Sequence, residues 1–395
     1  MKKWLLCLVF LVLLMNCLTG CSKNAASAQN EGKEQTEKIG ETLRVALVGP
    51  MTGDFSQYGT SFKKGVQLFI DLYNENGGYH GTPVEIEIFD DKNDAKEAAT
   101  IANKILAEGD YACVIGPFSS TCALAMAEVL DQEKVLTIAP SCSHPDYTAL
   151  YDYTFRMPLV NTEEARAAAE YLDDKLNAKK VGVIYTNNDW GATVDGAFTE
   201  YAAEHNLEIV ADEGFIIGQT KDFTPMITKM KQGGAEAVYL ICQYTEGAQM
   251  IRQIEDNAPD IRVVLSGSAY QEEILTLAGD GAKDAAWIVS ASAQITDKMK
   301  ELDSILREKY DGSSDDNFVC YAYNAAMVAL TGLEKAGTTD ADAWKQAILD
   351  IGDYEGLNGK FKIRTEDRNI DGVYAVAKVN EDGASFTKYA FADIK

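Results

Sequence analysis

Two neighbouring stretches decide the fold: LRVALVGP at residues 43–50 and FKKGVQLFIDLY at residues 62–73. The first is a short apolar run that ends at Gly49-Pro50, a pattern typical of a buried strand. The second carries apolar residues at helical spacing and is followed by Asn76-Gly77-Gly78, so it predicts a helix that stops there. A strand followed by a helix at this spacing is the repeating unit of an α/β fold.

The same alternation continues along the chain and begins again after a break near residues 156–161. Further strands are predicted at 84–89, 111–115, 135–138, 181–185, 208–211, 237–241, 263–265, 359–363 and 373–379. Further helices are predicted at 95–106, 120–130, 162–176, 192–203, 226–231, 246–256, 299–309, 318–336 and 341–351. Two such series in succession predict two doubly wound, Rossmann-like lobes with parallel sheets.

The length and the net charge of the chain indicate how many domains it has and which partners are unfavourable. A chain of 395 residues suits two domains rather than one core. Its net charge of −25 makes nucleic acid an unfavourable partner, because a polyanion cannot neutralise phosphates. An anionic bilayer would also repel the folded body.

The N-terminus predicts export. Lys2 and Lys3 precede an almost purely apolar run at residues 5–15, which is too short to span a bilayer comfortably. Leu18-Thr19-Gly20-Cys21 then resembles the lipobox of bacterial lipoproteins. The resemblance implies a signal peptide over residues 1–20, lipidation of Cys21 and a flexible tether over residues 21–41. An ordinary secretory signal with an incidental cysteine is the alternative.

Cysteine usage gives little support for a metal site. Beyond Cys21 the chain has five cysteines and no C-x-x-C pair: Cys113, Cys122, Cys142, Cys242 and Cys320. Disulfides can form in an exported protein. One disulfide among Cys113, Cys122 and Cys142 is one alternative, and buried free thiols are the other. We expect no metal site and no cofactor.

Polar loops follow the predicted strands, at the sheet edge where open parallel sheets bind ligands. The loop at residues 49–59 contains no G-x-G-x-x-G and no P-loop lysine, so it does not predict a nucleotide. Ser119-Ser120-Thr121 opens a helix and suits a small anion such as a carboxylate, although either serine could be only an N-cap. Residues 139–143 form a second polar loop on the same edge.

The second lobe offers aromatic side chains at equivalent places. Trp190 and Tyr244 each follow a predicted strand by a few residues. Either one alone is more often a packing residue than a ligand contact. Together, opposite an anion site, they predict a cleft that closes on a small organic acid.

The chain resembles the type I periplasmic binding proteins, in the branch of ABC importers that binds leucine, isoleucine and valine. The resemblance covers residues 42–390 and is carried by the order and spacing of GPMTGDFSQYG (49–59), NGGYHG (76–81), FDD (89–91), IGPFSS (115–120), APSCS (139–143) and NDWG (188–191). It implies two lobes joined by three hinge crossings. The implied N-terminal lobe is 42–160 plus 292–371, and the C-terminal lobe is 161–291 plus 372–395.

The resemblance also implies roles for single residues. Ser120 matches the serine that holds the ligand carboxylate, Ser141 matches a backbone contact, and Ser143 matches a hydroxyl contact. Tyr58, Trp190 and Tyr244 match aromatic residues around the ligand. Relatives with amino-acid ligands place an acid after the strand that ends near Leu265, but here the aligned residue is Ala269. Glu246, Glu272 or Glu273 are the candidate ammonium partners.

The function that follows is a lipid-anchored, extracytoplasmic, monomeric binding protein that delivers a small amino acid to a membrane permease. A non-amino-acid carboxylate as ligand and a role in sensing remain open alternatives. An enzyme is disfavoured, because no G-x-S-x-G or H-E-x-x-H pattern is present and only Cys142 and His144 stand near each other in a cleft loop.

Overall fold

The computed structural model describes residues 40–290, 297–314, 316–383 and 385–390. The predicted signal peptide, Cys21 and nearly all of the predicted tether lie outside these residues.

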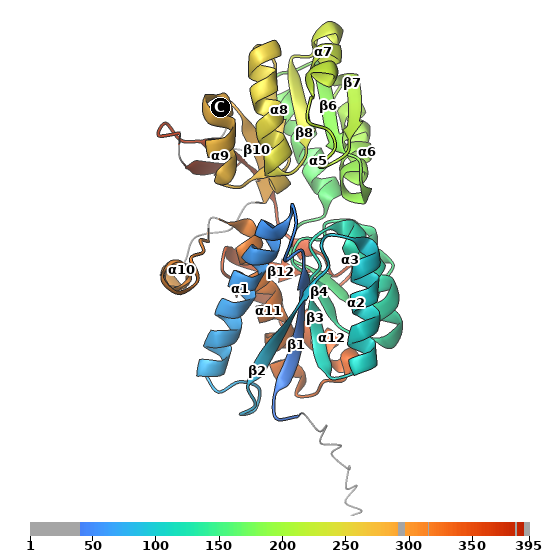
Figure 1. The fold of residues 1–395 in the computed structure, drawn as a ribbon, viewed down its shortest axis with the longest axis vertical. Helices are drawn as coiled ribbons and strands as arrows, with labels where there is room; N and C mark the ends of the chain where they lie inside the picture. The colour runs from blue at the N-terminus through green and yellow to red at the C-terminus, as the bar shows by residue number, and fades with distance from the viewer. Residues whose placement is uncertain (1–39, 291–296, 315, 384, 391–395) are drawn as a thin grey trace, which may run out of the picture. The chain divides into compact units, whose positions relative to one another are not determined.

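The first lobe is built on a five-stranded parallel sheet (Figure 1), with strand order β2-β1-β3-β4-β5. Its strands are β1 (Leu43–Gly49), β2 (Val84–Asp90), β3 (Tyr111–Ile115), β4 (Thr137–Ala139) and β5 (Thr154–Arg156). β1 lies between β2 and β3 and is almost wholly buried, as its continuous apolar run predicts for a strand covered on both faces.

Helices cover both faces of this sheet. One face packs against α2 (Ala95–Glu108) and α3 (Ser120–Leu130). The other face packs against α1 (Ser56–Glu75) and α11 (Asn317–Ala336), which returns from far along the chain. The remaining helices of the lobe are α4 (Asp146–Ala149), α10 (Asp297–Tyr310) and α12 (Ala341–Leu349).

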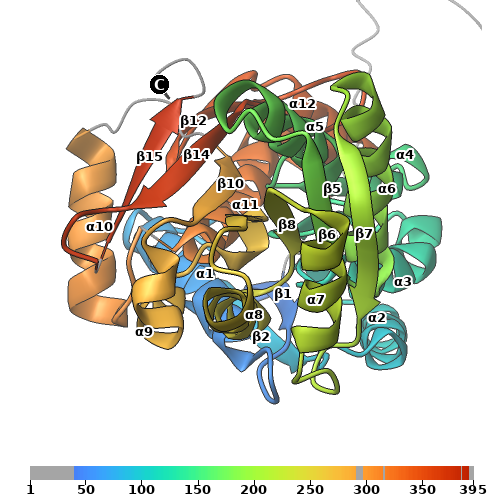
Figure 2. The ribbon, with the colours of Figure 1, turned by 90° about the horizontal axis from the view of Figure 1, so that it is seen from above.

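The second lobe is built on a seven-stranded sheet of order β15-β14-β10-β9-β8-β6-β7 (Figure 2). The parallel strands are β6 (Lys180–Thr186), β7 (Glu208–Phe215), β8 (Ala237–Ile241), β9 (Arg262–Leu265) and β10 (Ala286–Ser290). β14 (Tyr374–Val379) and β15 (Phe386–Ala390) add an antiparallel edge, which the sequence analysis did not foresee.

Helices again cover both faces of the sheet. One face packs against α5 (Asn161–Glu170) and α6 (Asp189–Glu204). The other packs against α7 (Thr224–Gly233), α8 (Tyr244–Asn257) and α9 (Glu273–Ala278). The expected α/β class with two doubly wound lobes is confirmed.

The chain passes between the two sheets three times. The passages lie between β5 and α5, between β10 and α10, and between β13 (Ile370–Asp371) and β14. β13 belongs to a small antiparallel sheet with β11 (Asp353–Gly356) and β12 (Gly359–Ile363). Within the described residues, no helix is long and apolar enough to cross a membrane.

Candidate ligand-binding site

The loop from β3 to α3 brings two serines to the carboxyl end of the first sheet. Gly116 makes its close approach possible: its φ is +129°, and a Cβ there would lie 2.1 Å from the Val48 carbonyl oxygen. Ser119 is the N-cap of α3, and its hydroxyl accepts from the Cys122 N–H at 3.4 Å. Ser120, 2% exposed, is the first residue of the helix. The capping role therefore falls to Ser119, while the Ser120 side chain hydrogen-bonds with the Cys142 thiol.

The loop after β4 lies beside this helix start. The Ser141 hydroxyl donates to the Phe118 carbonyl oxygen, which ties the two loops together. Ser143 is 8% exposed, and its carbonyl accepts from the Asn161 N–H, the first residue of α5, at 3.0 Å. The two loops thus form one polar surface that also touches the start of the second lobe.

Cys142 in the same loop is not suited to nucleophilic catalysis. Its side chain is fully buried, and burial raises the pKa of its thiol above the ordinary value. His144 has an Nδ1 that accepts from the Asp146 N–H, so it is engaged locally. All five cysteines from Cys113 onward are free and buried.

The facing surface of the second lobe is built from the loops after β6 and β8. Asn188 caps α6 by accepting from the Gly191 N–H at 2.9 Å, and this places Trp190 in the first turn at 7% exposure. Gln243 follows β8 and contacts the Thr186 hydroxyl at 3.4 Å. A side-chain cap thus fixes the first segment, and a side-chain contact to Thr186 fixes the second.

Two small cavities lie where these surfaces meet. The larger cleft cavity, of about 50 Å³, is lined by Ser141, Ser143, Glu164, Trp190, Gly267, Ser268 and eight others. The smaller cleft cavity, of about 30 Å³, is lined by Phe118, Ser119, Ser120, Ser141, Asn188, Trp190, Gln243, Ser268 and Phe318. A dry cavity of about 150 Å³ can hold benzene, so each of these two cavities is small for an organic ligand as the lobes stand here.

The structure thus brings together four of the predicted site residues: Ser120, Ser141, Ser143 and Trp190. The sequence analysis did not single out Gln243, Ser268 or Phe318, although the first two stand on strand-end loops that it had marked. It also did not single out Glu164. A signal was present, because Glu164 shares one helical face with Ala168 and Tyr171, both buried.

The predicted aromatic residues Tyr58 and Tyr244 do not line either cleft cavity. Tyr58 is 1% exposed and stacks on Phe118 with a ring-centroid distance of 4.2 Å. Tyr244, from the other lobe, meets the Tyr58 ring edge-on at 6.3 Å. These rings form an aromatic contact between the lobes beside the cavities.

The predicted ammonium partners also lie outside both cleft cavities. Glu246, 6% exposed, is in the first turn of α8, and burial raises the pKa of its carboxyl. Glu272 and Glu273 are exposed at the start of α9. Ala269 is fully buried in the core of the second lobe.

Glu164 lies in the first turn of α5 and lines the larger cleft cavity. Its Oε1 accepts from the Gly267 N–H at 3.0 Å and from the Tyr239 hydroxyl at 3.1 Å. Burial raises the pKa of this carboxyl from 4.5 to about 7, against the opposing effect of these two hydrogen bonds.

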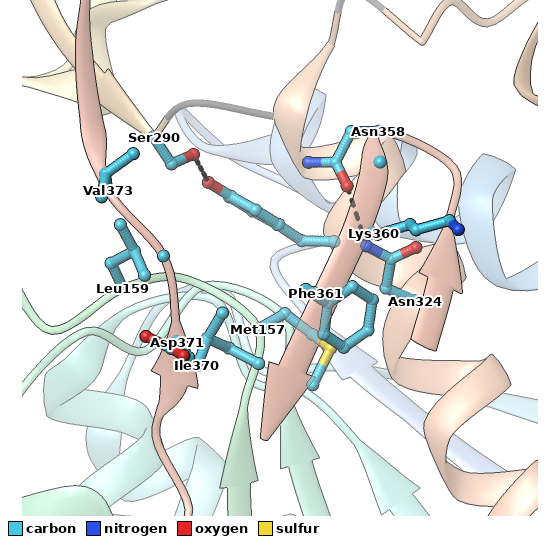
Figure 3. Close-up of a pocket in the computed structure, with 13 residues that line it drawn as sticks. Met157, Leu159, Ser290, Asn324, Asn358, Lys360, Phe361, Ile370, Asp371 and Val373 are labelled. Carbon is cyan, nitrogen blue, oxygen red and sulfur yellow. Dashed lines mark hydrogen bonds between the residues drawn. The ribbon is translucent and has the colours of Figure 1, made fainter. Parts of the chain in front are cut away.

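A larger cavity of about 330 Å³, the hinge cavity (Figure 3), shares Leu159, Ser290 and Tyr321 with the larger cleft cavity. It is lined mainly by β12, by the passage after β13 and by α11. The Ser290 hydroxyl and the Tyr321 hydroxyl lie 2.6 Å apart and border both this cavity and the larger cleft cavity. None of the predicted site residues lines the hinge cavity.

Comparison with known proteins agrees with this geometry. The leucine-, isoleucine-, valine-, threonine- and alanine-binding protein of Pseudomonas aeruginosa is 28% identical over 309 residues, 78% of this chain and 82% of the relative. The branched-chain amino-acid transporter substrate-binding protein LivJ of Streptococcus pneumoniae, solved with isoleucine, has a TM-score of 0.78 at 25% identity and covers 88% and 99% of the two chains. The leucine-binding protein LivK of Thermotoga maritima has a TM-score of 0.81 at 22% identity, with 88% and 98% covered.

These likenesses confirm the expected resemblance and the expectation of a solute-binding transport protein rather than an enzyme. They also confirm a location outside the cytoplasm, where such proteins work. The model of the periplasmic binding protein family matches residues 42–384, nearly the whole described chain. The chain therefore belongs to the periplasmic binding protein family.

Proposed function

We propose that this protein binds a branched-chain amino acid between its lobes and delivers it to the membrane permease of an ABC importer. The observation that carries the proposal is the larger cleft cavity. Serine hydroxyls of the first lobe and an acid and an aromatic ring of the second lobe line the same small space. The printed ligands of the relatives from Pseudomonas and Streptococcus support this ligand class.

Ser120 and Ser143 would bind the ligand carboxylate through their hydroxyls, and Ser141 through its backbone, since its own hydroxyl donates to the Phe118 carbonyl oxygen. Ser120 stands at the start of α3, where unpaired N–H groups and the helix dipole favour an anion. Trp190 would pack on the ligand side chain when the lobes, 42–160 plus 292–371 and 161–291 plus 372–395, close by a hinge motion. Tyr58 and Tyr244, which meet across the lobes, would tighten the closed state.

The ligand can be identified directly. Purified protein is denatured to release bound small molecules, which are identified by mass spectrometry. The refolded protein is then titrated by calorimetry with leucine, isoleucine, valine, alanine, glutamate and lysine. We expect binding of the branched-chain members and none of lysine; no binding of any amino acid would refute the proposal.

A second ligand class is favoured by one observation. The loop Ser266–Tyr270 contains no acid, so a carboxylate without an ammonium group would meet no unpaired charge there. The same titration therefore includes the deaminated analogues of the branched-chain amino acids. Tighter binding of an analogue than of its amino acid would support this class instead.

We also propose that Cys21 carries the lipid anchor that keeps the protein near its permease, acting as a monomer. A tether raises the local concentration of the binding protein at the membrane. Cys21→Ala should release the protein from the membrane fraction without changing its affinity for ligand. Retention of the variant in the membrane fraction would contradict the anchor.

A further inference from the structure

Glu164 is a buried acid without a cationic partner. It is 6% exposed, whereas the side chain of its neighbour Glu163 is 48% exposed and pairs with Arg166 at 2.8 Å. Across the described ranges, no lysine, arginine or histidine nitrogen lies within 4.0 Å of the Glu164 carboxylate. A carboxylate removed from water without a counter-charge is costly, so the buried group favours either a proton or a cationic partner from outside the chain.

Hydrogen bonds from the described residues engage one oxygen of the Glu164 carboxylate but not the other. Oε1 accepts the hydrogen bonds from Gly267 and Tyr239, which fix the orientation of the group. Oε2 accepts from no donor in the described part of the chain, and Glu164 lines the larger cleft cavity. The arrangement leaves an oriented carboxyl oxygen, without a donor from the described residues, beside that cavity.

The Glu164 carboxylate also contacts the loop after β9. Relatives with amino-acid ligands carry an acid in this loop, whereas this chain has Ala269 there. Gly267 and Ser268, directly after β9, line the same cavity as Glu164. Ala269 cannot contribute because it has no polar side chain and packs into the core. A residue from α5 therefore brings negative charge to the place where the strand-end loop does not.

We propose that Glu164 binds the ammonium group of the ligand and so makes the site selective for amino acids over other carboxylates. This inference rests on the proposed function. The ligand would span the larger cleft cavity, with its carboxylate at the Ser143 hydroxyl and the Ser141 backbone and its ammonium at Glu164. Glu246 and Glu272, which line neither cleft cavity, would not take this role.

The test compares L-leucine with 4-methylpentanoate, the same carboxylate without its amino group. Wild type, Glu164→Gln and Glu164→Asp are titrated by calorimetry at pH 8. The amide keeps a hydrogen-bond acceptor but no charge, so Glu164→Gln should weaken L-leucine binding by about 10- to 100-fold. Binding of 4-methylpentanoate should not weaken, and Glu164→Asp should keep part of the preference for L-leucine.

Glu163→Gln is the matched control, since it removes the neighbouring exposed charge from the same helix. An L-leucine affinity of Glu164→Gln equal to that of Glu163→Gln would overturn the inference while leaving the proposed function intact. Wild type that binds no amino acid would instead refute the proposed function. The two failures are thus distinguishable.

If Glu164→Gln does not fold, a measurement on the wild-type protein alone still tests whether Glu164 binds the ammonium group. The titratable groups facing Glu164 are Tyr239 on β8, Tyr321 on α11 and Tyr374 on β14, and burial raises the pKa of each hydroxyl. None of them ionises near pH 7, so Glu164 is the group that can exchange a proton there. Calorimetry at pH 7 in two buffers of different ionisation heat should show proton release on binding L-leucine but not 4-methylpentanoate. Equal proton release with both ligands would overturn the inference.

Discussion

The two adjacent serines at the start of α3 have different roles: Ser119 caps the helix, and Ser120 is the proposed ligand contact. Both serines line the smaller cleft cavity, but it is the Ser119 hydroxyl that caps the helix. Ser119→Ala should lower the free energy of unfolding by about 1 kcal/mol, because an N–H of the first turn loses its acceptor. Ser120→Ala should leave that free energy nearly unchanged and weaken ligand binding by about tenfold. Urea titration measures the free energy of unfolding, and calorimetry measures ligand affinity. A larger loss of stability in Ser120→Ala together with a larger loss of affinity in Ser119→Ala would contradict the assignment.

Glu164 should also make the stability of the ligand-free protein depend on pH. Its pKa is about 7 in the folded state and near the ordinary 4.5 in the unfolded state. The folded protein therefore binds more protons between these values, and its free energy of unfolding falls as pH rises through this window. The full effect, reached above about pH 7, is at most about 3 kcal/mol.

The comparison of wild type with Glu164→Gln isolates this contribution. Asp91 and Asp195 also have raised pKa values, about 6 and about 7, but they are present in both proteins and cancel. Urea titrations at pH 5 and pH 8 should show Glu164→Gln gaining stability relative to wild type at the higher pH. The same relative stability at both pH values would show that Glu164 keeps an ordinary pKa.

Among the elements, α1 and α11 pack so closely that their contact requires a glycine. A Cβ on Gly65 of α1 would lie 2.2 Å from the Val319 carbonyl oxygen of α11. Gly65→Ala would force two backbones apart and should cost about 1–3 kcal/mol or more of unfolding free energy. Differential scanning calorimetry or urea titration measures the loss.

Gly196 provides the matched control for this substitution. It lies in the interior of α6, is exposed, and a Cβ there would meet no atom within 4 Å. Gly196→Ala should stabilise the protein by about 0.5–1 kcal/mol, because alanine favours a helix over the unfolded chain. Equal effects of the two substitutions would show that α1 and α11 are less tightly packed than described.

Prediction at the element scale succeeded where a segment carries its own periodic signal. The central helices and the long strands were located from apolar spacing alone, including α1 and β1. β5, β10 and β15 were not predicted as strands. β5 has only three residues, so its existence depends on pairing with β4 rather than on any pattern in Thr154–Arg156.

At the scale of the whole molecule, Asp316 joins the two lobes. It caps α11 at the Phe318 N–H (2.8 Å), accepts from the Ser61 hydroxyl (2.6 Å) and accepts from Gln271 Nε2 of the second lobe at 3.2 Å. The first two bonds lie within the first lobe, so only the bond to Gln271 depends on how the lobes meet.

Removing this bond should favour the open state. Gln271→Ala should weaken ligand binding by about tenfold, mostly through faster dissociation, because the closed complex loses a hydrogen bond to a charged group. Stopped-flow dissociation measurements test this. Gln132→Ala, an exposed side chain of the first lobe, serves as the control. Unchanged dissociation in Gln271→Ala would mean that this contact does not hold the lobes together.

The sequence by itself determined the α/β class, the two-lobe organisation and the strand-end loops that bear the site. These follow from local patterns, because apolar periodicity and turn residues act over a few neighbouring positions. Tertiary structure alone decided which side chains meet in the cavities. It left Tyr58 and Tyr244 beside them and brought Glu164 on α5 next to Gly267 after β9, more than a hundred residues along the chain. Such a meeting depends on the register of two packed elements and on burial, which no local pattern of residues specifies.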